Sequence, residues 1–168
     1  MKKKTPKISK TSKAKVDGLL LVAMNSEVEA MKFYNNAGEK AQSDAGKKFF
    51  QELADFEQHH FEKIKRIVES RASGMKLEAY KPKLKQRDIK PEVAGEFEPN
   101  KNEITEVLML GIKAEMTAQA RYQKIAEQID DMIGKEIFKN LAEDERRHHD
   151  LLEAQFYQIS NKGTIIWE

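Results

Sequence analysis

The sequence predicts an all-α protein, a four-helix bundle made of two helical hairpins that a long crossover joins. Good helix formers such as Lys, Glu, Ala and Leu are abundant, whereas the 168 residues include only 8 Gly and 4 Pro. Apolar residues recur every three or four positions in four long segments, as on one face of a helix. Short turns separate the first two segments and the last two, so each pair is expected to be antiparallel.

The first hairpin is expected to contain helices over residues 16–42 and 45–72. Ser43 or Asp44 is the expected N-cap of the second helix, because both side chains accept hydrogen bonds from the first turn. Ser73 and Gly74 follow this helix, and glycine is typical of the position just beyond a helix end.

A crossover over about residues 74–101 is expected next, because apolar periodicity is lost there. A connection of this length is uncommon in a compact domain unless it crosses the molecule. The second hairpin is expected to contain helices over residues 103–129 and 135–159. The crossover holds three of the four prolines, namely Pro82, Pro91 and Pro99.

The expected bundle domain spans residues 16–160, with a tail at each end. Residues 1–15 hold seven Lys and no acidic residue, which favours a solvated, disordered tail over a contact with a polyanion or a membrane surface. Residues 161–168 include apolar side chains that we expect to pack on the bundle or on a partner. With a net charge of +2 and no apolar stretch of transmembrane length, neither nucleic acid nor a membrane is an expected partner.

The sequence contains no Cys. This excludes disulfides, thiolate catalysis and metal sites built on Cys. Together with the lack of a recognisable export signal, it favours a cytoplasmic location.

A set of acidic, His and Tyr residues occurs twice, 88 positions apart. Eleven of the 34 residues in 27–60 are identical to their counterparts in 115–148. This indicates an internal duplication, or two halves shaped for one site. The repeated residues that matter for function are the pairs Glu27/Glu115, Tyr34/Tyr122, Glu57/Glu145 and His60/His148.

The repeated residues predict a site for two metal ions. Residues three apart on a helix, such as Glu57 and His60, project from the same face. Each repeated Glu lies in an apolar stripe, where an ionised carboxylate is costly unless it is paired or binds a cation. Two divalent ions would balance four converging carboxylates, and neutral imidazoles would supply nitrogen ligands. The predicted ligands are Glu27, Glu57, His60, Glu115, Glu145 and His148.

Other readings of single residues remain open at this point. One Glu-x-x-His alone is more often a surface ion pair than a ligand pair. His59 lies two residues from Glu57 and is expected at the surface, whereas His149 lies four residues from Glu145 and could compete as a ligand. Tyr34 and Tyr122 are either core aromatics or hydroxyl donors to a ligand carboxylate.

The four runs that begin at Glu27, Leu53, Glu115 and Leu141 resemble the rubrerythrin branch of the ferritin-like di-iron carboxylate proteins. The resemblance implies a ferritin-like bundle that holds two iron ions, with manganese or a mixed pair as a further possibility. It implies that Glu57 and Glu145 bridge the metals and that the other four ligands are terminal.

Two departures from the family pattern affect the expected reaction. Full-length rubrerythrins carry a rubredoxin-like iron–Cys module, so the expected electron donor here is another molecule, such as a rubredoxin-like protein. Rubrerythrins also have an additional Glu in the third helix, where this sequence has Ala118, and the repeat counterpart is Ala30.

The resemblance favours a non-haem di-iron oxidoreductase that reduces peroxide or dioxygen with an external electron donor, in a response to oxidative stress. The alternative is an iron-binding or ferroxidase protein for storage or buffering, without sustained turnover. A third possibility is a metal-free helical interaction module. The long crossover also favours a homodimer, in which helices could be exchanged.

Overall fold

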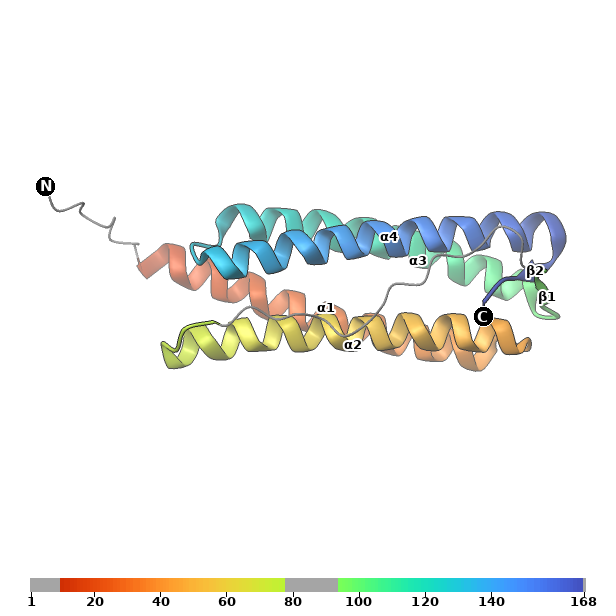
Figure 1. Ribbon diagram of the computed structural model, residues 1–168, viewed down its shortest axis with the longest axis horizontal. Helices are drawn as coiled ribbons and strands as arrows, with labels where there is room; N and C mark the ends of the chain where they lie inside the picture. Colours follow the sequence, from red (N-terminus) through yellow and green to blue (C-terminus); the bar gives the residue numbers. More distant parts are fainter. Residues whose placement is uncertain (1–9, 78–93, 168) are drawn as a thin grey trace, which may run out of the picture.

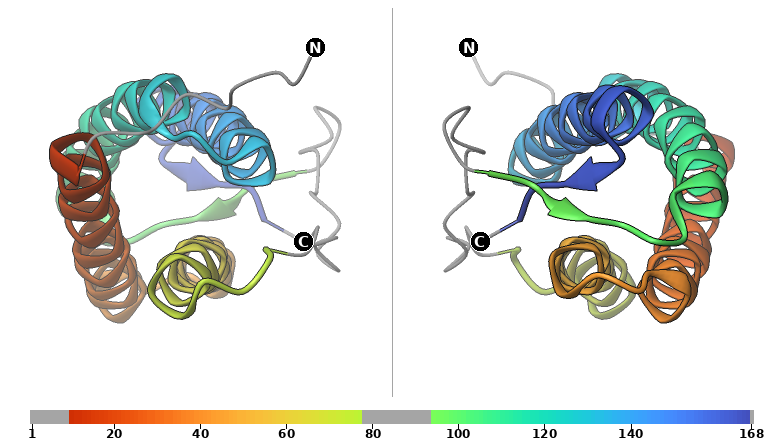
Figure 2. Two further views of the ribbon diagram at one scale, coloured as in Figure 1. Left: turned by 90° about the vertical axis from the view of Figure 1, so that its left-hand side faces the viewer. Right: turned by 90° about the vertical axis from the view of Figure 1, so that its right-hand side faces the viewer.

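The computed structural model describes residues 10–77 and 94–167, and within them the chain forms four long antiparallel helices (Figure 1). This confirms the predicted all-α class and the ferritin-like bundle of two hairpins. Viewed along its length, the bundle has the four helices arranged around a common axis (Figure 2). The helices are α1 (Lys10–Lys40), α2 (Asp44–Ser73), α3 (Lys101–Gln128) and α4 (Met132–Lys162).

The second helix of each hairpin begins with the same type of side-chain N-cap, at equivalent positions of the repeat. The Ser43 side chain accepts a hydrogen bond from the Gly46 amide and caps α2, and the Asp131 side chain does the same for the Gly134 amide and α4. A Cβ atom on Gly46 would lie 2.8 Å from the Ser43 hydroxyl oxygen, so the cap requires glycine there. Of the two N-caps expected for α2, Ser43 is the one that forms.

α1 begins at Lys10, although the sequence analysis places residues 10–15 in a tail. Val16 and Leu20 are fully buried and anchor this end of the helix in the core. Extending an anchored helix outward costs little, because each added residue gains one backbone hydrogen bond. Residues 1–9 and most of the crossover, residues 78–93, lie outside the described residues.

A small antiparallel ribbon closes one end of the bundle. Strand β1 (Glu96–Phe97) pairs with strand β2 (Thr164–Ile165), with Glu96 opposite Ile165 (Figure 1). Neither strand is predicted from the sequence, because two residues are too few to show an alternating pattern. Beyond the ribbon, the Trp167 ring packs edge-on against Phe49 with 5.2 Å between centroids. The C-terminal tail therefore packs on the bundle of its own chain.

Polar residues divide the core into two apolar clusters. The cluster nearer the ribbon includes Phe49, Phe50, Leu108 and Leu152, and that at the opposite end includes Leu20, Ile64, Tyr122 and Phe138. Each helix contributes apolar residues to both clusters, and its predicted metal ligands lie between these two stretches. No described helix has the length and hydropathy that crossing a bilayer requires.

Candidate metal centre

The six predicted metal ligands lie together in the middle of the bundle. Each is only 1–3% exposed to solvent. α1 contributes Glu27 and α3 contributes Glu115, whereas α2 and α4 each contribute a Glu and a His three residues apart. The internal repeat thus places its four pairs of equivalent residues on the two hairpins around one buried site.

Both imidazoles direct Nδ1 toward the carboxylates. His60 Nδ1 lies 3.1 Å from Glu57 Oε2, 3.1 Å from Glu145 Oε1 and 3.8 Å from Glu27 Oε2. His148 Nδ1 lies 3.1 Å from Glu145 Oε2 and 3.5 Å from Glu57 Oε1. Glu57 and Glu145 therefore each lie between the two imidazoles, whose ring centroids are 5.4 Å apart.

The arrangement of these donors fits metal ions better than hydrogen bonds alone. Glu57, His60, Glu145 and His148 offer donor atoms that all lie within 4.8 Å of one another. Three buried oxygens (Glu27 Oε2, Glu57 Oε1 and Glu145 Oε1) lack a hydrogen-bond partner within the described residues, although each lies near an imidazole Nδ1. An imidazole N–H can donate a hydrogen bond to only one of the surrounding oxygens at a time, whereas a metal ion near the same place could bind several of them. The buried Glu and His cluster therefore fits a di-metal site.

The four carboxyl groups differ in their acidity. Burial, followed by the nearby Glu57 charge, raises the pKa of the Glu27 and Glu115 carboxyls well above the ordinary value. Burial would also raise the pKa of Glu57, but hydrogen bonds to His148 and His60 lower it well below its ordinary value. The pKa of Glu145 is lowered as well, because the contacts with His60 and His148 outweigh burial and the charge of Glu57.

The two imidazoles hold protons tightly when no metal is bound. Burial would lower their pKa values, but the neighbouring carboxylates more than reverse this. Hydrogen bonds with Glu145 and Glu57 raise the pKa of His148 to about 9, and the charge of Glu145 helps to raise that of His60. The carboxylates of Glu57 and Glu145 therefore favour the charged form of the two imidazoles, whereas burial favours the neutral form of Glu27 and Glu115.

The two repeated tyrosines are equally buried but have different partners. The Tyr34 hydroxyl donates a hydrogen bond to Glu115 Oε1, as expected for a residue that supports a ligand carboxylate. The Tyr122 hydroxyl has no hydrogen-bond partner in the described part of the chain, and its ring packs against Phe138 at 5.7 Å between centroids. Tyr122 thus lies in the apolar cluster and, among the described residues, makes no hydrogen bond to a ligand carboxylate.

The other two histidines lie outside the buried site. His59 is half-buried, and its Nδ1 lies 2.6 Å from the Asp55 carbonyl oxygen of its own helix. His149 is also half-buried and groups with the exposed Asp150 and Glu153 on α4. It therefore faces away from Glu145, so it does not compete with His148 for the buried carboxylates.

Asp144 and Lys63 lie beside the site but were not selected from the sequence. The Asp144 carboxylate lies 3.6 Å from His60 Nε2 and 3.3 Å from the buried Lys63 ammonium group. The sequence did contain a signal, because Asp144 directly precedes Glu145 in one half, whereas Phe56 occupies the equivalent place in the other. A comparison of the two halves for differences, and not only for identities, would have selected it.

A groove of about 760 Å³ between α1 and α3 reaches the site from its carboxylate side. Its buried lining includes Glu27, Glu57, Glu115 and Glu145, whereas neither ligand histidine lines it. The half-buried Ala30 and Ala118 are equivalent residues of the repeat and also line the groove. A small molecule or a metal ion can thus approach the carboxylates between these two helices.

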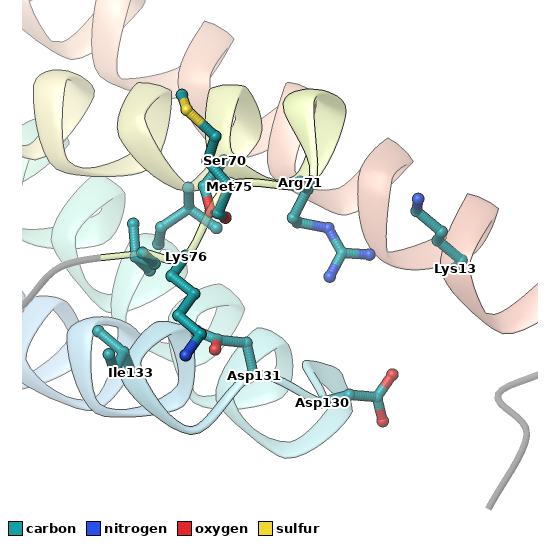
Figure 3. Close-up of a pocket in the computed structure, with 11 residues that line it drawn as sticks. Lys13, Ser70, Arg71, Met75, Lys76, Asp130, Asp131 and Ile133 are labelled. Atoms are coloured by element: carbon teal, nitrogen blue, oxygen red, sulfur yellow. The ribbon is translucent and has the colours of Figure 1, made fainter.

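A second hollow, of about 710 Å³, lies at the end of the bundle away from the ribbon (Figure 3). Charged residues of both signs, including Lys13, Arg71 and Asp130, surround apolar residues such as Ile67 and Ile133. None of the predicted site residues lines this hollow.

A four-helix bundle that supplies two Glu and two Glu-x-x-His pairs to one buried site is the arrangement of the ferritin-like di-metal carboxylate proteins. The family model described as Rubrerythrin matches residues 18–99 and 106–164, so the chain belongs to the rubrerythrin family. Its structure is similar to that of a hypothetical protein from Pyrococcus furiosus, with 28% sequence identity and a TM-score of 0.68. That alignment covers 87% of this chain and 90% of the other. A search of curated proteins finds no match.

Proposed function

We propose that the protein is a di-iron carboxylate protein of the rubrerythrin type that reduces peroxide or dioxygen with electrons from an external donor. The observation that carries this proposal is the convergence of four buried carboxyl groups and two imidazoles from four helices. Two divalent cations would balance four carboxylates, which are costly to bury without a positive charge nearby. The proposed ligands are Glu27, Glu57, His60, Glu115, Glu145 and His148.

In this proposal, Glu57 and Glu145 would hold both metals, because each lies between the two imidazoles. Glu27 on α1 and Glu115 on α3 would complete the ligand set. Two bound iron ions would supply the two electrons that peroxide reduction consumes, and manganese or a mixed pair would suit the same oxygen and nitrogen donors.

The residues around the ligands would orient them and admit the oxidant. The Tyr34 hydroxyl would fix the orientation of Glu115 through the hydrogen bond that joins α1 to α3. The groove beside Ala30 and Ala118 would admit peroxide or dioxygen from the carboxylate side. The imidazoles line the opposite side of the site and would stay out of contact with the oxidant.

The test begins with anaerobic loading of Fe(II), followed by metal counting. We expect two iron ions per chain in the wild type, and fewer in a Glu57→Ala variant that keeps the helical circular dichroism of the wild type. Peroxide is then added together with a reduced rubredoxin-like protein as the donor. Sustained, donor-dependent consumption of peroxide supports the enzyme, and a stoichiometry far from two contradicts the metal site itself.

The alternative is an iron-binding or ferroxidase protein without sustained turnover. Ala118 favours this alternative, because it leaves the groove without the additional carboxylate that the family resemblance leads one to expect on α3. In the same experiment, a single oxidation stoichiometric with the bound iron, unaffected by the donor, supports storage or buffering over catalysis.

A homodimer is part of the proposal. Leu21 and Val22 on α1 and their repeat counterparts Met109 and Leu110 on α3 are each about half exposed, and a dimer would cover apolar side chains of this kind. Light scattering should give the mass of a dimer for the wild type and of a monomer for a variant with Val22→Lys and Leu110→Lys. A wild-type monomer would contradict the dimer without affecting the metal site.

A further inference from the structure

The two ligand histidines are equivalent in the sequence repeat, but the residues behind their rings differ. Here, behind means the side of the ring at Nε2, away from Glu57 and Glu145. Both direct Nδ1 toward Glu57 and Glu145 at similar distances, between 3.1 and 3.5 Å. The inner half of the site is therefore nearly symmetric. The outer nitrogen, Nε2, is the atom whose surroundings differ.

A charged pair lies behind His60. Its Nε2 atom is 3.6 Å from Asp144 Oδ2 on α4, and the same oxygen is 3.3 Å from the Lys63 ammonium group on α2. The Lys63 side chain is only 9% exposed. Lys63 thus holds Asp144 between the two helices, at the outer edge of the His60 ring.

Apolar residues occupy the equivalent places behind His148. The 88-residue offset relates Asp144 to Phe56 and Lys63 to Leu151. The Phe56 ring packs against the His148 ring with 5.1 Å between centroids. Within residues 10–77 and 94–167, the ion pairs of His148 all involve Nδ1. The repeat therefore has the charged pair behind one histidine only.

The terminal carboxylates are unequal as well. Glu115 Oε1 accepts the Tyr34 hydroxyl hydrogen bond, whereas the Tyr122 hydroxyl makes no equivalent bond within the described chain. Glu27 Oε2, which lies 3.8 Å from His60 Nδ1, likewise has no hydrogen-bond partner there. The Tyr34 bond orients Glu115, whereas the charged pair lies beside His60. The two halves of the site are therefore supported by different residues.

We propose that Asp144 and Lys63 are positioning residues that make the two metal sites unequal, so that the half containing His60 binds its metal first. The inference rests on the proposed metal-binding function. A carboxylate beside the outer nitrogen of a ligand histidine favours one orientation of the ring and makes it more basic, and loss of such a partner typically weakens metal binding by about 10–100-fold. We expect a similar ratio between the first and second binding events.

The test is titration of the metal-free protein with Co(II), followed by its visible absorption and by competition with a chromophoric chelator. The wild type should bind two equivalents in two resolved steps. His148→Ala should keep the tighter step, and His60→Ala should keep the weaker one. Two equal sites in the wild type, or the opposite assignment, would overturn the inference, whereas binding of no metal would contradict the proposed function itself.

The repeat supplies the variants that separate positioning from general stability. Lys63→Leu with Asp144→Phe copies the surroundings of His148 and should weaken the first step about 10–100-fold, so that the two steps merge. Phe56→Asp with Leu151→Lys places the charged pair behind His148 and should tighten the second step. If either double variant folds and binds Co(II) in the same two steps as the wild type, the inference is overturned. Glu143→Gln, an exposed change next to Asp144, is the matched control and should leave both steps unaltered.

Discussion

The Tyr34 hydroxyl on α1 donates a hydrogen bond to the Glu115 carboxylate on α3, and this bond joins the two hairpins beside the metal site. Its repeat counterpart, the Tyr122 hydroxyl, is also buried but has no hydrogen-bond partner among the described residues. The same residue type at equivalent places of a repeat therefore has two different environments. The difference leads directly to a matched pair of variants.

Tyr34→Phe should destabilise the protein by about 1–3 kcal/mol, because it leaves a buried Glu115 oxygen without its donor. Tyr122→Phe should change the free energy of unfolding by less than about 1 kcal/mol, because it removes a hydroxyl that has no partner. Urea denaturation of the two variants measures both values. Equal losses in the two variants would contradict the asymmetry.

Metal binding should release protons. The pKa values of Glu27, Glu115, His60 and His148 are all raised in the metal-free site, so each group holds its proton to a higher pH than usual. A metal binds the deprotonated form of each group, so up to four protons should leave per two metals bound. Calorimetric titration in buffers with different enthalpies of ionisation counts them. Release of none would mean that the metal does not bind to these side chains.

The metal-free protein should lose stability as the pH rises toward 9. The pKa of His148 is raised to about 9 in the folded state, above its ordinary value. The protonated His148 therefore adds to the free energy of unfolding. This contribution is fully present below the pKa of the unfolded state, about 6.5, and on the order of 3 kcal/mol is lost as the pH rises through about 9.

Urea midpoints of the metal-free protein between pH 6 and 9 measure this loss. The half-buried His149 is outside the site, so His149→Gln should show the same profile. His148→Gln should flatten it. Bound metal should oppose the trend, because deprotonated imidazole is the form that binds. A midpoint that rises with pH in the metal-free wild type would contradict the assigned protonation.

Glu98 should be essential for the ribbon end of the bundle. Its buried carboxylate accepts hydrogen bonds from the Gln42 and Asn100 amides, each at 3.0 Å, and from both the amide and the hydroxyl of Ser43. Glu98→Gln replaces one acceptor oxygen by a donor and should cost about 2–4 kcal/mol. Glu96→Gln, at an exposed residue that also accepts bonds at the start of α2, should cost less than about 1 kcal/mol.

The contribution of Glu98 should also depend on pH. Burial would raise its pKa, but the hydrogen bonds from Ser43, Gln42 and Asn100 lower it below the ordinary value. Its contribution is therefore present at neutral pH and is lost as the pH falls through the lowered pKa. Acid denaturation should therefore begin at a higher pH in Glu98→Gln than in Glu96→Gln. The opposite order would contradict the assigned roles of the two carboxylates.

Trp167 should contribute to stability through its ring and not through its indole N–H. The ring contacts Phe49, and Nε1 has no hydrogen-bond partner in the described structure. Trp167→Ala should cost about 3 kcal/mol, and Trp167→Phe should retain most of the stability. Trp167 is the single Trp of the chain, so its fluorescence reports directly on the tail in the wild type. Equal effects of the two variants would contradict the packing role.

Local spacing in the sequence was enough to predict the four helices, the N-cap of α2 as either Ser43 or Asp44, and the residues that gather at the site. Helical periodicity is a local property, and the repeat gave the site residues a second, independent indication. Hydrophobic periodicity did not predict β1 and β2, because a strand of two residues is too short to show a repeating pattern. It also failed at Lys10–Lys15, where helix continues outward from the buried Val16.

The sequence by itself determined the number of helices, the direction of each hairpin and which carboxylates and imidazoles share a helix face, because backbone hydrogen bonding sets these within a few turns. Only the tertiary structure decided which equivalent residues differ in their contacts. Tyr34 donates a hydrogen bond to Glu115, whereas the Tyr122 hydroxyl has no partner among the described residues. Asp144 lies beside His60 Nε2, whereas the Phe56 ring packs against the His148 ring. These contacts join helices far apart in the chain, so they depend on the rotation and spacing of packed helices, which no local pattern specifies.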